Sequence, residues 1–147
     1  MDRTLKSDFV FWVATRLFRR TLVETILGTP IDDVTSASAG DQQRTYAMLD
    51  LIQPISLREK GLRNEEMVAR SLRRYELERI SAPALVASVE DDGYLTYGPA
   101  LYTAQQIPGA KFIGYARGGH LWVGHEAELS AAVRKFLVTP GTAAPVQ

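Results

Sequence analysis

Two short strand-like runs, separated by a helix-like segment, constrain the fold of this 147-residue chain more than any other feature. The first is ALVASV over 84–89 and the second is KFIGYA over 111–116. Short apolar runs of this kind are typical of strands buried in a parallel sheet. A helix is predicted over 99–107, between the runs, and a second helix over 126–138. The order of elements predicts an α/β fold with a parallel β-α-β-α unit.

The first half of the chain has helical periodicity and almost no strand signal. One helix is expected over 4–27 and is ended by Gly28, Thr29 and Pro30. Another is expected over 41–53, before Pro54. A third is expected to begin at Asn64, a good N-cap residue. The apolar face of this third helix would consist of Val68, Leu72 and Tyr75.

Polar residues follow each expected strand at its carboxyl end. Asp91 and Asp92 follow the first strand, and Gly118-Gly119-His120 follow the second. In open α/β sheets, catalytic groups gather at this edge. An acid and an imidazole on neighbouring loops there are the orienting and base members of a nucleophile–His–acid triad. The paired glycines allow close approach of the backbone.

These residues, taken in order, resemble the C-terminal third of the α/β-hydrolase family. The resemblance includes 80–86 (ISAPALV), Asp91-Asp92, 107–110 (IPGA) and Gly118-Gly119-His120. It covers roughly residues 78–138. In the corresponding part of the family, a strand ends in the catalytic acid and a later strand leads into Gly-His. The last expected helix ends in 133–137 (VRKFL), which is similar to the end of the family's closing helix.

The resemblance implies a partial α/β-hydrolase fold in three parts. Residues 1–79 would be a helical cap, 80–138 a core segment and 139–147 a flexible tail. The implied chemistry is hydrolysis of esters, amides or C–C bonds beside a carbonyl, on a small-molecule substrate. The family usually needs no metal or organic cofactor.

The same resemblance assigns roles to individual residues. His120 would be the triad base. Asp92 would be the acid, in a register that puts Val89 where the family frequently has a glycine; Asp91 is the alternative acid.

A nucleophile elbow of the form Gly-x-Ser-x-Gly is missing from this sequence. The nearest pattern is Ser36-Ala37-Ser38-Ala39-Gly40, which lacks the first glycine. Ser38 also suits the N-cap of a helix, with Asp41 three residues further on, and the pattern favours this interpretation. The resemblance therefore implies the acid and base of a triad without an evident nucleophile, as expected of a truncated or fragmentary hydrolase.

Two other functions remain open. The chain could be a small hydrolase that uses Ser38 or builds its site across a dimer. It could also be a non-enzymatic interaction module. A sheet of two strands has exposed edges, so homo-oligomers that pair through such an edge are expected under the fragment interpretation.

Composition excludes several classes of protein. Seventeen basic and seventeen acidic residues give zero formal charge, unlike a nucleic-acid-binding domain. The absence of cysteine excludes disulfides and thiolate chemistry.

The apolar run over 9–14 is far shorter than the ~20 residues needed to span a bilayer. It also lacks the features of a signal peptide, so we expect a cytoplasmic protein without a membrane-spanning segment.

A metal site is not expected either. His125 follows His120 by five residues, which is not the i, i+4 spacing that puts two ligands on one helical face. Asp32-Asp33 is interpreted as a polar turn.

Overall fold

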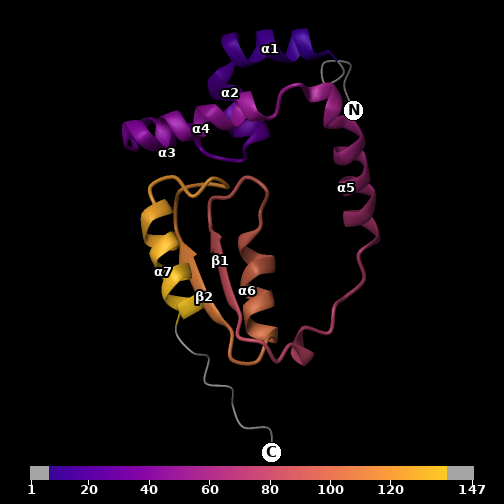
Figure 1. Cartoon of the computed structure of the whole chain (residues 1–147), viewed down its shortest axis with the longest axis vertical. Helices are drawn as coiled ribbons and strands as arrows, with labels where there is room; N and C mark the ends of the chain where they lie inside the picture. Colours follow the sequence, from indigo (N-terminus) through magenta and orange to yellow (C-terminus); the bar gives the residue numbers. More distant parts are fainter. Residues whose placement is uncertain (1–6, 139–147) are drawn as a thin grey trace, which may run out of the picture.

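The computed structural model describes residues 7–138, and it places a layer of helices over the carboxyl end of a small α/β unit (Figure 1). In the view of Figure 1 the helices of residues 8–51, drawn in indigo and purple, lie above the two strands, and the helix of residues 59–71 lies to the right. The helices are α1 (Asp8–Leu17), α2 (Arg19–Ile26), α3 (Ile31–Ser36), α4 (Ala39–Leu51), α5 (Glu59–Ser71), α6 (Tyr97–Gln106) and α7 (Glu126–Val138), with 3-10 turns at Ile55–Leu57 and Leu77–Arg79. The strands are β1 (Leu85–Val89) and β2 (Lys111–Tyr115).

The two strands are parallel, as predicted. Their register runs from Leu85 opposite Lys111 to Val89 opposite Tyr115. Helix α6 connects them and packs against both, so the segment is a β-α-β unit followed by α7. The prediction of a mixed α/β chain is confirmed.

The sheet is small and incompletely covered. In the described part of the chain it has two strands, and α7 has no fully buried residue. Large apolar side chains are exposed in many places within residues 7–138; the most exposed include Phe9, Leu17, Leu57, Leu95 and Leu137. In the same range, 7–138, no helix is long and apolar enough to cross a membrane.

A break at Phe18 divides the helix expected over 4–27 into α1 and α2. Phe18 has φ −123° and ψ 32°, outside the helical region, and α1 begins after its N-cap Ser7. Residues 4–6 of the expected helix lie outside the described range. Because the chain turns at Phe18, both short helices can direct a buried face inwards, with Phe11 and Thr15 from α1 and Val23 from α2.

The third expected helix was placed wrongly. It begins at Glu59, so Asn64 lies in its interior and is not an N-cap. The three residues of the expected apolar face, Val68, Leu72 and Tyr75, are all exposed. Leu72 and Tyr75 also lie beyond the end of the helix. Ion pairs one turn apart stabilise this solvent-facing helix instead, at 2.7 Å for Arg63–Glu59 and 2.6 Å for Arg70–Glu66.

The main core lies among the helices, and it includes one side chain from the loop after β2. The buried cluster is Val23, Leu27, Val34, Leu49 and Val123. Helix α4, which was expected over 41–53, supplies Leu49. Val123 comes from the same loop as His120, so apolar packing fixes this loop against the helical layer.

Candidate functional site

Asp92 and His120 meet at the carboxyl edge of the sheet, between the strands and the helical layer. Asp92 Oδ2 lies 3.0 Å from His120 Nδ1. The Asp92 side chain is 5% exposed, whereas the imidazole is 46% exposed. Within residues 7–138 the imidazole Nε2 of His120 has no hydrogen-bond partner. The pair thus has a buried acid and an accessible base.

Two further donors hold the carboxylate of Asp92. Its Oδ1 accepts from the Tyr94 amide at 2.8 Å, and its Oδ2 accepts from the Thr96 hydroxyl, which also contacts Ser88 Oγ. Burial alone would raise the pKa of Asp92, but the bonds from Thr96, His120 and Tyr94 outweigh it and lower the pKa below 3.8. Asp92 is therefore ionised at neutral pH, the form that orients an imidazole.

Replacing Thr96 with valine is expected to raise the pKa of Asp92, because the carboxylate loses a hydroxyl donor. The free energy of unfolding at pH 7 should fall by about 1 kcal/mol. Carbon-13 NMR titration of the Asp92 carboxyl and urea unfolding measure the two effects. Thr103→Val is the matched control, since Thr96 is the N-cap of α6, whereas Thr103 lies within this helix and donates to the Pro99 carbonyl. A pKa unchanged by Thr96→Val would contradict this account of Asp92.

Gly28 joins the two loops that carry the pair. Its carbonyl accepts from the Gly93 amide at 2.9 Å and from the His120 amide at 3.1 Å. It has φ +55°, and a Cβ there would lie 2.8 Å from the Tyr94 ring. This ring also contacts the imidazole of His120 edge-on, with centroids 4.8 Å apart. A glycine predicted only to end a helix therefore also organises the site.

Asp91 lies beside the pair but has different partners. Its Oδ1 accepts from the Gly119 amide at 2.8 Å, and its Oδ2 from the Gly118 amide at 3.3 Å. Of the two acids considered for the triad, the structure places Asp92 against His120 and Asp91 against the backbone of the loop after β2.

Ser38 is the N-cap of α4, as the sequence favoured. Its Oγ accepts from the Asp41 amide at 3.1 Å and donates to Asp41 Oδ2 at 2.9 Å. Its hydroxyl is thus engaged with Asp41, and it makes no hydrogen bond with His120. Across the described residues, no serine or threonine hydroxyl forms a hydrogen bond with the imidazole.

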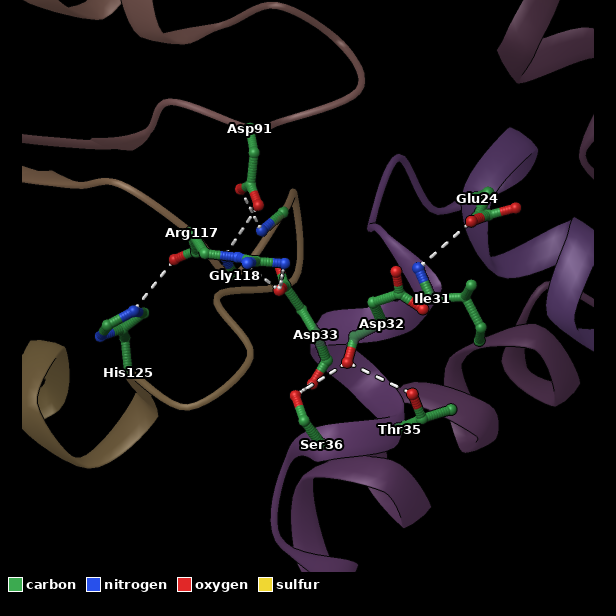
Figure 2. A network of polar contacts seen from close by, with 11 residues as sticks. Glu24, Ile31, Asp32, Asp33, Thr35, Ser36, Asp91, Arg117, Gly118 and His125 are labelled. Carbon is green, nitrogen blue, oxygen red and sulfur yellow. Dashed lines mark hydrogen bonds and ion pairs between the residues drawn. The ribbon is translucent and has the colours of Figure 1, made fainter.

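Sequence reasoning missed Asp33. Asp32 and Asp33 lie in the first turn of α3 and do not form the expected polar turn. Asp33 Oδ1 accepts from Arg117 Nε at 2.8 Å, and its Oδ2 accepts from the Gly118 amide at 3.1 Å. Figure 2 shows Asp33 and Asp91 approaching this backbone from two different segments. Asp33 and Arg117 are 84 positions apart, so no local sequence pattern predicts their contact.

The other histidine, His125, makes structural contacts with an aromatic ring and with the backbone. His125 stacks on Tyr115 with centroids 4.0 Å apart, and its Nε2 lies 3.0 Å from the Arg117 carbonyl. In the part of the chain that the structure describes, no three His, Asp or Glu side chains are grouped to hold a metal ion.

Comparison of the chain with protein-family models, curated proteins and solved structures found no match. The chemistry of the site is therefore argued from its own geometry. A buried carboxylate oriented on an accessible imidazole, at the carboxyl edge of parallel strands, suits proton transfer to and from a hydroxyl nucleophile.

Proposed function

We propose that this chain carries the acid–base part of an α/β-hydrolase-type active site, with a helical cap over a partial hydrolase core. His120 is the general base, and Asp92 is the acid that orients it. The serine nucleophile comes from outside residues 7–138, in sequence joined to this chain or from a partner. The observation that supports the proposal most directly is the 3.0 Å contact between buried Asp92 and His120 Nδ1.

The roles follow from the two nitrogens of the imidazole. Ionised Asp92 accepts a hydrogen bond from the Nδ1–H of His120, which leaves Nε2 without a proton and with a free lone pair. Nε2 removes the proton of the serine hydroxyl as the serine oxygen bonds to the carbonyl carbon of an ester-like substrate. The imidazolium, stabilised by Asp92, then gives this proton to the leaving group as its bond to carbon breaks. In the second half of the reaction, Nε2 removes a proton from water as the water oxygen bonds to the acyl carbon. The imidazolium then returns this proton to the serine oxygen as its bond to carbon breaks, and the carboxylic acid product is released.

Labelling with a fluorophosphonate followed by intact-mass spectrometry tests the proposal. The samples are the chain alone and the longest protein that its source gene encodes in frame with it. We expect one adduct per molecule in the longer protein, on a serine outside residues 7–138, and no adduct on the chain alone. His120→Ala should abolish the adduct, because the serine then has no base.

His125→Phe is the matched control, because it removes the other histidine and keeps an aromatic ring on Tyr115. It should label normally. An adduct that survives His120→Ala would overturn the assigned base. Stoichiometric labelling of the chain alone would place the nucleophile within it and favour a small hydrolase. If the chain binds a partner with an affinity that neither Asp92→Asn nor His120→Ala changes, that result would favour an interaction module.

A further inference from the structure

Two carboxyl groups from distant segments converge on one backbone amide beside His120. Asp33, on α3, and Asp91, in the loop after β1, both accept from the Gly118 amide, at 3.1 and 3.3 Å (Figure 2). The two carboxyl groups therefore meet at this amide, and each influences the pKa of the other. Arg117 adds an ion pair to Asp33 at 2.6 Å. This arrangement connects α3, the β1 loop and the β2 loop at one point.

The same contacts determine the path of the backbone into His120. Four successive amides each have an acceptor: Gly118 on Asp33 and Asp91, Gly119 on Asp91, His120 on the Gly28 carbonyl, and Leu121 on Thr29 Oγ1. Gly118 and Gly119 are buried, with φ +125° and +59°. A buried glycine pair has little intrinsic preference for one path, so its hydrogen-bond partners select the path.

The two carboxyl groups of this cluster influence each other's ionisation. The facing groups are the carboxyls of Asp33 and Asp91 and the guanidinium of Arg117. The imidazole of His125 lies beside Gly118, and the Asp92–His120 pair lies on the adjoining residues. Burial, and then Asp33, raise the pKa of Asp91. For Asp33, burial is outweighed by the bonds from Asp91, Gly118 and Arg117, which lower its pKa. Protonated Asp91 can donate to ionised Asp33 while its other oxygen accepts from Gly119.

We propose that Asp33 and Asp91 form a proton-sharing latch that holds α3 against the Gly118–Gly119 turn and so positions His120 against Asp92. The latch rests on the proposed role of His120. Asp33 and Asp91 are positioning residues and do not touch the reacting atoms. The latch is strongest when the pair keeps one proton. It weakens as pH rises through the ionisation of Asp91, because two carboxylates then face one guanidinium.

Amide hydrogen exchange at residues 118–121, followed by NMR across pH, tests the latch on the whole chain. Asp33→Asn leaves Arg117 without its anion, and we expect exchange at Gly118 and Gly119 to be tenfold to a hundredfold faster. Asp91→Asn imitates the protonated acid, so it should keep the protection of the wild type at low pH. It should also remove the loss of protection that the wild type shows as pH rises.

Asp32→Asn is the matched control, since it removes the same charge from an exposed position on α3. It should leave both exchange and its pH profile unchanged. The latch is overturned if Asp33→Asn protects these amides like the wild type, or if Asp91→Asn keeps the pH-dependent step. The fluorophosphonate adduct reports separately on Asp92 and His120. If the adduct depends on His120 but the substitutions do not change hydrogen exchange, the latch is refuted and the proposed role of His120 remains.

Discussion

Replacing Gly119 with alanine is expected to lower the free energy of unfolding by about 2–5 kcal/mol. Gly119 has φ +59°, a conformation that costs an alanine roughly 1–2 kcal/mol. A Cβ would also lie 2.5 Å from Thr29 Cα and 2.8 Å from Pro30 Cδ. Because Thr29 Cα belongs to the backbone, one of the two loops must move to relieve the contact. Urea unfolding measures the loss.

Two other glycines separate the effect of backbone conformation from that of close approach. Gly109 and Gly124 have φ +73° and +82°, but a Cβ on either would meet no atom within 4 Å. Alanine at these positions should cost only the conformational part, about 1–2 kcal/mol. If Gly119→Ala is no more destabilising than Gly109→Ala, the loop after β2 does not approach Thr29 as closely as the structure indicates.

The α/β unit was predictable because its signals are local. The runs at 84–89 and 111–116 differ from the true strands by one residue at one end, and α7 has the expected bounds. Strand, loop and helix alternate there at short spacing, so periodicity and turn residues agree with the tertiary structure. The same order predicted that Asp92 and His120 would come to one edge, where the structure places them together.

The helical half was harder because burial there does not follow helical periodicity. α5 has good apolar spacing in sequence, yet all of its large apolar side chains are exposed and its ion pairs stabilise it. α1 is apolar on nearly every side, so its pattern does not mark the break at Phe18. Only packing against the rest of the molecule determines which face is buried.

The supporting residues of the site also escaped prediction. Gly28 has the sequence signature of a helix stop, and Asp33 that of a polar turn. Their roles depend on contacts with Gly93, Gly118 and His120, far along the chain. A single sequence contains no local signal for such partners, and their identity requires the assembled structure.

Replacing Asp92 with asparagine is expected to lower the free energy of unfolding by about 2–3 kcal/mol at pH 7. Oδ2 of Asp92 accepts from both the Thr96 hydroxyl and His120 Nδ1. An amide nitrogen in its place cannot accept from either, so two donors lose their partner. An oxygen placed there instead keeps both contacts but puts the amide nitrogen against the Tyr94 N–H, so that donor loses its acceptor.

The pH dependence of this loss distinguishes a held charge from simple packing. Because the folded pKa of Asp92 is lowered, its carboxylate stabilises the fold above the ordinary carboxyl pKa near 3.9, and the contribution disappears as pH falls through the lower folded value. The difference between wild type and Asp92→Asn in urea unfolding should therefore shrink between pH 5 and pH 3. Asp50→Asn, at an exposed carboxylate 3.6 Å from Arg19, should change stability by less than about 0.5 kcal/mol at either pH. If Asp92→Asn lowers the free energy of unfolding by the same amount at every pH, the charge of Asp92 does not contribute to stability. The imidazole would then lack the ionised partner that proton transfer from a serine requires.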